Sequence, residues 1–330
     1  MHVLAAPDKF PGTASACVVA AAVARVARAC GCTCDEAPVA DGGEGTLEAL
    51  GGANRTSTVT GPLGDPVPAA WRRSGRTAVL EMALASGLEL VGGPEANDPV
   101  AAATFGTGEL VAAALDAGCR RVILGVGGSA STDGGLGAVR ALEPVSRLAG
   151  VDLVVACDVR TTFFDAAPVF APQKGASPAQ VELLRRRLER LAQVYEQSYG
   201  VDVRLLEGSG AAGGLAGGLA AVGARLVPGF DVVADELQLH ERLEGADLAV
   251  AGEGFLDEQS FAGKAVGGVV ELATAAGVPV LAVAGEILDD VVVPDAVEAV
   301  SLVERFGRDR AMSDTLTCVE RVVADRLSRR

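Results

Sequence analysis

The amino-acid sequence predicts an α/β protein built of two domains, and three observations lead to this fold class. Short apolar segments alternate with segments of helical periodicity at both ends of the chain. Between these ends, residues 54–83 form several short strand-like runs that glycine and proline interrupt. The chain has 330 residues, of which 49% are hydrophobic, and this is enough apolar material for two separate cores.

The two ends of the chain carry the same strand–helix–strand rhythm. At the start, residues 2–7 predict a short buried strand, residues 15–30 a helix and residues 35–40 a second strand. Near the end, residues 246–254 predict a strand and its following loop, residues 265–277 a helix ended by glycine, and residues 278–286 a strand. Such units imply a parallel sheet covered by helices.

The middle of the chain interrupts this rhythm. Residues 54–83 predict antiparallel hairpins, and they are followed by a helix at 108–118 and by strands at 120–128 and 152–159. Residues 177–200 predict a long helix, with Ser177 as its N-cap and Pro178 in its first turn.

The simplest architecture is one doubly wound (Rossmann-like) α/β domain formed by both termini, with a second α/β domain inserted. The predicted boundaries are residues 1–60 plus 231–330 for the first domain and 61–230 for the inserted one. We expect the active site in the cleft between the domains, where ligand sites are common.

Charge and composition exclude several classes of partner. The net charge of −15 argues against binding to nucleic acid or to an acidic membrane, because both need a basic surface. The apolar runs are too short to span a bilayer, and no secretory signal is evident, so a cytoplasmic protein is expected. Cys30, Cys32 and Cys34 lack the spacing of a zinc site, which favours reduced thiols. The sequence leaves the oligomeric state open, a homodimer included.

Glycine-rich loops that carry acids or lysines follow several of the predicted strands. One of them, "GVGGSASTDGGLG" at residues 125–137, follows the apolar run "RVIL". In open α/β sheets these positions are the carboxyl ends of strands, where ligands bind. The candidate residues in these loops are Asp8, Lys9, Asp41, Gly42, Gly43, Glu44, Ser129, Asp133, Asp158, Gln173, Lys174, Gly213, Gly214, Glu253, Asp257, Ser260 and Lys264.

This combination of residues points to phosphoryl transfer. Carboxylates hold Mg²⁺ through oxygen, lysines meet phosphate as point charges, and bare glycine loops offer N–H groups to anions. Catalysis of phosphoryl transfer is mostly positioning and charge stabilisation. The P-loop signature is absent, and the G-x-G-x-x-G match at Gly208, Gly210 and Gly213 does not clearly follow a strand. A lysine in such a loop has a second interpretation, as a solvated surface residue.

Taken together, the motifs resemble the bacterial glycerate kinase family, of which this chain looks like a divergent member. The most specific matches are "VADGGEGT", "GGSASTDGG" and "PQKGA", and together with other matching segments such as "AGEGFLDEQSFAGK" they occur in the family's order. The resemblance implies ATP and Mg²⁺ as cofactors and a small hydroxylated substrate. The activity it implies is the conversion of glycerate to 2-phosphoglycerate.

With this resemblance we assign roles to the candidate residues. Catalytic roles go to Asp8, Lys9, Asp133, Lys174 and Lys264. Asp133 and Asp158 are the candidate metal ligands, although spacing alone leaves open which carboxylate is the base and which holds metal. Binding of substrate or nucleotide is assigned to Asp41, Gly42, Gly43, Glu44, Ser129, Gln173, Gly213, Gly214, Glu253, Phe255, Asp257 and Ser260.

Two departures from the family's pattern concern positive charge. The family usually has lysine where this chain has Pro11, and arginine where it has Phe255. The first alternative is therefore a kinase of a different small polyol or cyclitol, with the ATP and metal site retained; Arg160 is another candidate partner for an acid. A second alternative is a non-catalytic binding protein of the same fold, which the many retained acids disfavour.

Overall fold

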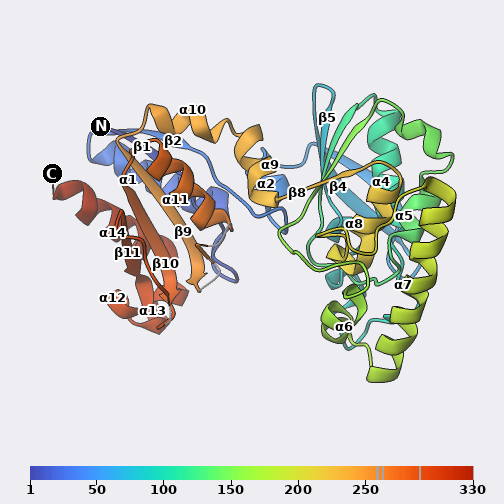
Figure 1. Cartoon of the computed structure of the whole chain (residues 1–330). Coiled ribbons are helices and arrows are strands. Elements are labelled where there is room, and N and C mark those ends of the chain that lie inside the picture. Colours follow the sequence, from blue (N-terminus) through green and yellow to red (C-terminus); the bar gives the residue numbers. More distant parts are fainter. Residues whose placement is uncertain (258–259, 262–263, 290, 330) are drawn as a thin grey trace. The chain divides into compact units, whose positions relative to one another are not determined.

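The chain divides into two compact units. The computed structural model describes residues 1–257, 260–261, 264–289 and 291–329. The terminal unit comprises Met1–Asp41, Glu48–Leu50 and Phe230–Arg330, and the inserted unit comprises Gly42–Leu47 and Gly51–Gly229 (Figure 1). Each unit is described here by itself.

The terminal unit contains a five-stranded sheet in which every neighbouring pair of strands is parallel. The strand order is β11-β10-β9-β1-β2. The strands are β1 (His2–Ala5), β2 (Thr33–Glu36), β9 (Leu248–Leu256), β10 (Val280–Ile287) and β11 (Val297–Ser301). The helices are α1 (Ala16–Ala29), α9 (Gly229–Glu236), α10 (Leu239–Glu244), α11 (Ala265–Ala275), α12 (Leu302–Phe306), α13 (Arg308–Ser313) and α14 (Thr315–Ser328).

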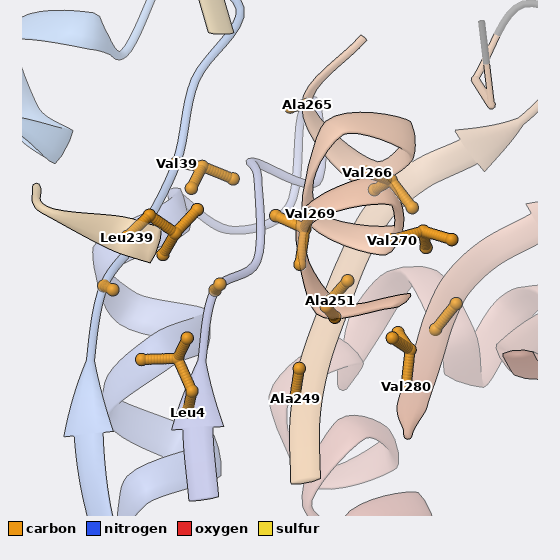
Figure 2. Packing of buried hydrophobic residues seen from close by; sticks show 14 of the residues in the cluster. Leu4, Val39, Leu239, Ala249, Ala251, Ala265, Val266, Val269, Val270 and Val280 are labelled. Carbon is orange, nitrogen blue, oxygen red and sulfur yellow. The ribbon is translucent and has the colours of Figure 1, made fainter. Parts of the chain in front are cut away.

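The central strands β1, β9 and β10 are largely buried on both faces, because helices cover both, whereas the edge strand β2 is mostly exposed. Val3 and Ala5 of β1 belong to a cluster that includes residues of α1 and α14. Leu4, between them in the chain, points to the opposite face and joins a cluster with Val266 and Val269 of α11 (Figure 2). This alternation follows from the two-residue period of a strand. The prediction of a doubly wound α/β domain is therefore confirmed.

The inserted unit contains a six-stranded mixed sheet in the order β3-β4-β5-β6-β7-β8. Its strands are β3 (Arg55–Thr60), β4 (Pro66–Ser74), β5 (Thr77–Glu81), β6 (Arg121–Gly125), β7 (Asp152–Ala156) and β8 (Arg225–Val227). β3, β4 and β5 pair antiparallel, which confirms the predicted hairpins, and β5 to β8 pair in parallel.

Helices of the inserted unit follow β5, β6 and β7. The α-helices are α3 (Ala83–Ser86), α4 (Phe105–Asp116), α5 (Leu136–Ala141), α6 (Ala166–Phe170), α7 (Pro178–Tyr199) and α8 (Ala211–Ala221). Short 3₁₀ helices span Glu89–Val91, Val145–Leu148 and Pro172–Lys174. The remaining helix, α2 (Thr46–Ala49), lies where the chain passes between the two units.

Two predicted boundaries are wrong. The segment Arg55–Thr60 was predicted in the first domain, but it pairs along its length with β4 and so belongs to the inserted unit. The second strand was predicted at residues 35–40, whereas β2 spans Thr33–Glu36. The chain after β2 stays extended, and Ala37 N–H still donates to Ala5 O (2.8 Å), which explains why the prediction ran on.

The predicted long helix is confirmed as α7. Ser177 Oγ accepts from Gln180 N–H (3.4 Å) and Gln180 Oε1 accepts from Ser177 N–H (2.9 Å), which forms a capping box. Gly200, in the left-handed conformation with φ 72°, ends the helix. All seven cysteines are free thiols. Within the described residues, no helix combines the length and apolarity needed to cross a membrane.

Candidate active site

The candidate residues of the terminal unit gather at the carboxyl ends of β1 and β9. The chain continues from β1 to β2 on one side and from β9 to β10 on the other, so the two central strands form the topological switch point of the sheet. Asp8 follows β1, and its N–H donates to Gly252 O of β9 (2.7 Å). This bond places Asp8 beside Glu253, the next residue of β9.

Asp8, Asp41, Glu253 and Asp257 form what we call the acidic cluster. Asp8 is only 6% exposed, and this burial raises its pKa to about 6, although Lys9, whose Nζ lies 4.0 Å from Asp8 Oδ1, opposes the shift and Asp41 adds to it. Burial also raises the pKa of Glu253 to about 7, with Asp8 and Asp257 contributing in the same direction. Carboxyl groups that titrate near neutral pH suit proton transfer.

Glu253 has one oxygen in an unusual environment. Its Oε1 is buried and has no hydrogen-bond partner among the described residues. A buried polar atom of this kind normally has a partner, which in a crystal is sometimes water or a ligand. The atom is therefore a fitting contact for a bound ligand or ion.

Lys264, the second lysine of the terminal unit, pairs with Asp257, which is hydrogen-bonded to Ser260. Asp257 N–H donates to Ser260 Oγ (3.0 Å), and Ser260 Oγ–H donates to Asp257 Oδ1 (3.0 Å). Lys264, the N-cap residue of α11, lies with its Nζ 3.6 Å from Asp257 Oδ2. The side chains of Lys264 and Asp257 are both partly exposed, so Lys264 remains accessible to a ligand.

The two positions that lack the family's positive charges lie close together. Phe255 is 49% exposed and follows Gly254 in β9. Pro11 packs on Gly254, because a Cβ added there would lie 2.6 Å from Pro11 Cδ. A proline and an aromatic ring therefore occupy the region where the family pattern has two cations.

In the inserted unit, the loop Gly42–Leu47 lies at the carboxyl ends of β5, β6 and β7. Val126 N–H, just after β6, donates to Gly42 O (3.1 Å), and a Cβ on Gly42 would lie 3.0 Å from Ala156 C of β7. Glu81, the buried last residue of β5, accepts from Gly45 N–H (3.1 Å) and Leu47 N–H (2.7 Å). Gly43 and Glu44 are carried by this loop, with Glu44 exposed.

Lys174 is a buried residue and not a solvated surface lysine. It is 3% exposed, and its Nζ donates to Ser129 Oγ (2.6 Å) and Ser131 O (2.6 Å). Burial lowers its pKa from the ordinary 10.5 to about 7, against the opposing effect of Asp133. Asn97 fixes the arrangement, since its Nδ2 donates to Ala130 O (3.1 Å) and Lys174 O (2.9 Å). The neighbouring Gln173 is exposed.

The loop beside Lys174 contains two hydroxyl groups that find no partner among the residues that the structure describes. Ser131 Oγ and Thr132 Oγ1 are both buried, and neither makes a hydrogen bond within the described part of the chain. An ammonium group, a serine bonded to it and two unsatisfied hydroxyls form a set of donors that fits phosphate oxygens. We refer to residues 125–135 and Lys174 together as the lysine loop.

Asp133 holds the lysine loop in place. Its carboxylate accepts from Thr104 N–H (2.9 Å), Thr104 Oγ1–H (2.8 Å), Gly135 N–H (3.1 Å) and Gly137 N–H (3.0 Å). Both oxygens are therefore occupied by the protein, which favours a positioning role over the predicted role in metal binding.

Asp158 is the better placed of the two predicted metal ligands. It is exposed after β7, and its Oδ1 accepts from Gly229 N–H (2.6 Å). The described residues contain no group of three or more His, Cys, Asp or Glu side chains arranged to hold a metal. Mg²⁺ does not need such a group, because one or two carboxylates and the phosphates of a nucleotide commonly suffice.

Gly213 and Gly214 pack against the lysine loop. Both are buried in the first turn of α8, where Ala212, Gly213 and Gly214 have left-handed φ angles of 53°, 67° and 89°. Gly134 N–H donates to Gly213 O (3.0 Å), and Gly214 approaches Gly134 Cα. This burial favours a packing role over direct contact with a nucleotide.

The substitution Gly213→Ala should strongly destabilise the inserted unit. Its Cβ would lie 2.2 Å from Ser131 O, so the loop has to move, and the left-handed conformation adds about 1–2 kcal/mol. Gly200→Ala is a matched control, because Gly200 has φ 72° and no neighbouring atom within 4 Å. Chemical denaturation should show a larger loss of unfolding free energy for Gly213→Ala than for Gly200→Ala; equal losses would show that the contact with Ser131 is unimportant.

The fold and the site together define an α/β phosphotransferase, a class that the comparisons with known proteins support and make more specific. The glycerate kinase family model matches residues 3–145 and 143–328. The chain belongs to the glycerate kinase family.

Named relatives and a solved structure agree with this membership. The chain is 39% identical to "Glycerate 2-kinase" of Escherichia coli (strain K12), over 88% of this chain and 87% of that protein. It is also 39% identical to "Glycerate kinase" of Bacillus subtilis (strain 168), over 88% of this chain and 86% of that protein. A solved structure from Salmonella typhimurium LT2, described as a glycerate kinase 2, superposes with a TM-score of 0.86 at 35% identity and covers 100% of this chain and 98% of its own.

Proposed function

We propose that this protein transfers the γ-phosphoryl group of ATP to the 2-hydroxyl of glycerate and forms 2-phosphoglycerate. The observation that carries the proposal is the lysine loop, in which the buried Lys174 ammonium bonds to Ser129 Oγ and Ser131 O, while the Ser131 and Thr132 hydroxyls have no partner among the described residues. The names of the relatives supply the acceptor and the hydroxyl. The chain has three lysines, Lys9, Lys174 and Lys264, and all are among the candidate residues, which further supports a function in binding anions.

The residues divide the work of such a reaction in a chemically reasonable way. The charge of Lys174, relayed in part through Ser129, stabilises the negative oxygens of the transferred group. Glu253 or Asp8, whose pKa values are raised by burial, accepts the proton that the acceptor hydroxyl loses. Mg²⁺ bound with the nucleotide, with Asp158 as the candidate protein ligand, would neutralise phosphate charge.

A turnover assay tests the proposal directly. We expect ATP consumption that depends on glycerate and Mg²⁺, and ³¹P NMR of the product should identify a phosphate on the 2-position. Consumption of ATP with a neutral polyol but not with glycerate would replace the acceptor in the proposal. A protein that consumes ATP with neither class of acceptor would contradict the kinase function.

The exposed ring of Phe255 favours a second candidate, a kinase of a small neutral polyol or cyclitol. A carboxylate in a partly buried site is best met by arginine, whereas an aromatic ring packs on the apolar face of a polyol. Pro11 beside Gly254 removes a second cation from the same region.

The substitution Phe255→Arg should therefore shift specificity towards the acid. We expect kcat/KM for glycerate, relative to that for glycerol or myo-inositol, to rise by about tenfold or more, since a hydrogen bond to a charged group contributes about 1.5–3 kcal/mol and about 1.4 kcal/mol is a factor of ten. Val292→Arg is the control, because Val292 is 84% exposed and outside the candidate site. An unchanged ratio in Phe255→Arg would show that position 255 does not meet the acceptor.

A further inference from the structure

A groove runs along α7 of the inserted unit, and nothing in the proposed function yet uses it. Its cavity volume is about 610 Å³, within the range typical of small-molecule sites. The walls come from α7, from the segment around Val100 and Ala102, and from Leu136 at the start of α5, which lies near α7 in Figure 1. Leu183 and Val194 mark the extent of the apolar wall along α7.

The groove shares two residues with the lysine loop. Thr132 and Asp133 line it, while Ser129 and Ser131 of the same loop bind Lys174. The Thr132 residue is only 1% exposed, and its Oγ1 has no hydrogen-bond partner in the described residues. One short segment, residues 129–133, thus contributes both to the wall of the groove and to the contacts of Lys174.

The rim of the groove is positive although the protein is acidic. Arg186, Arg187 and Arg190 line it, on a chain whose net charge is −15, although Arg186 is paired with Glu182 (3.8 Å). Arg187 donates to Val100 O (2.9 Å) and Arg190 donates to Gln193 Oε1 (2.9 Å), and neither forms an ion pair within the described ranges. A second copy of the chain, meeting the groove by two-fold symmetry, would bring the same arginines together. This charge therefore favours a small anionic ligand.

From this geometry we propose that the groove along α7 is the subsite for the adenine base of the nucleotide. The inference rests on the proposed function and adds the location of the base. The apolar walls pack on the faces of the base, Thr132 supplies a hydrogen-bonding group, and the arginines attract the phosphates. The phosphate chain then runs towards the lysine loop, which Thr132 and Asp133 connect to the groove.

Calorimetric titration of the full chain with ADP in the presence of Mg²⁺ tests the subsite. Val194→Trp fills the groove from its exposed side, since Val194 is 37% exposed. We expect the Kd for ADP to rise at least tenfold and the Kd for tripolyphosphate, which has no base, to stay within twofold of native. Val169→Trp is the matched control, because Val169 is 52% exposed on α6 and does not line the groove. If ADP alone binds the native chain too weakly to titrate, the KM for ATP is compared instead among the native chain, Val194→Trp and Val169→Trp.

The outcomes separate the subsite from the function. Native ADP affinity in Val194→Trp would overturn the subsite and leave the kinase function intact. An equal loss of ADP and tripolyphosphate binding would also overturn it, because the base would then not be the group that the groove recognises. If sedimentation shows a native dimer that Val194→Trp dissociates without loss of ADP binding, the groove is an interface between copies. Absence of ATP turnover and of nucleotide binding in the native chain would instead reject the proposed function.

Discussion

Replacement of Lys174 by methionine is expected to lower kcat by about 10²-fold or more while the fold survives, because loss of a preorganised electrostatic stabiliser typically costs this much. Methionine has a similar length and no charge, so it occupies the same buried position between Ser129 and Ser131. Steady-state kinetics measure the loss of kcat, and a thermal melt of the same sample checks that the fold survives. Arg76→Met is the control, since Arg76 is an exposed cation outside the candidate site.

The stability of this variant should depend on pH with a definite sign. The folded-state pKa of Lys174 is about 7, below its ordinary 10.5, so between these values the unfolded chain binds more protons than the folded one. The native protein therefore gains stability as pH rises from 7 towards 10.5. Lys174→Met lacks this gain, and its melting temperature relative to native should be highest at pH 6 and fall by pH 9.

Two results would contradict the assignment of Lys174. A change confined to a few-fold in KM, with kcat intact, would make the lysine a minor binding residue. A difference in melting temperature that does not vary between pH 6 and pH 9 would show that the ammonium carries no cost of burial. If the first result appeared without the second, Lys174 would be a structural lysine of the inserted unit.

Asp133→Asn is expected to lower the melting temperature by about 5 °C or more and to reduce turnover by more than tenfold. Asparagine keeps the shape but replaces one acceptor oxygen by an NH₂ group, which would face N–H donors of Thr104, Gly135 or Gly137. Each buried donor left without a partner costs about 1–3 kcal/mol, and in a unit of this size 1 kcal/mol corresponds to roughly 2–4 °C. Added Mg²⁺ should not restore activity.

Asp158→Asn provides the matched comparison. Asp158 is exposed, so its variant should melt close to native and should need more Mg²⁺ for half-maximal activity. The reverse pattern, with a native melting temperature and Mg²⁺-dependent rescue in Asp133→Asn, would restore Asp133 as the metal ligand. Titration of Mg²⁺ in both variants at saturating ATP distinguishes the two assignments.

The sequence predicted the layout of the fold better than the roles of individual residues. The continuous apolar runs "HVLAAP" and "VPVLAVAG" report burial directly, since a strand buried on both faces is almost wholly hydrophobic. The capping box of α7 is local too, because Ser177 and Gln180 are three residues apart. Such features depend on neighbours in the chain, and they can be recognised without knowledge of the tertiary structure.

Glu81, Asn97 and Thr104 were missed because their partners are distant in the sequence. Glu81 accepts from Gly45 and Leu47, more than thirty positions away, and no glycine-rich motif surrounds it. A signal was nevertheless present: a carboxylate within the apolar run "AVLEMA" needs buried partners. Asp133 was recognised as important, but only its hydrogen bonds with Thr104 and the following glycines indicate that it positions a loop.

The pairing of β1 with β9 has a consequence for folding during synthesis on the ribosome. Val3 pairs with Leu248, so the amino-terminal strand has to wait for most of the chain to be translated before its central neighbour exists. At about 5–20 residues per second, this wait lasts on the order of 10–50 s. Gly51–Gly229 of the inserted unit emerges meanwhile as one uninterrupted stretch. β2 is already available to pair with β1, so during synthesis the nascent chain exposes only the edge of β1 that later meets β9, and chaperones that shield such edges should associate with its first forty residues.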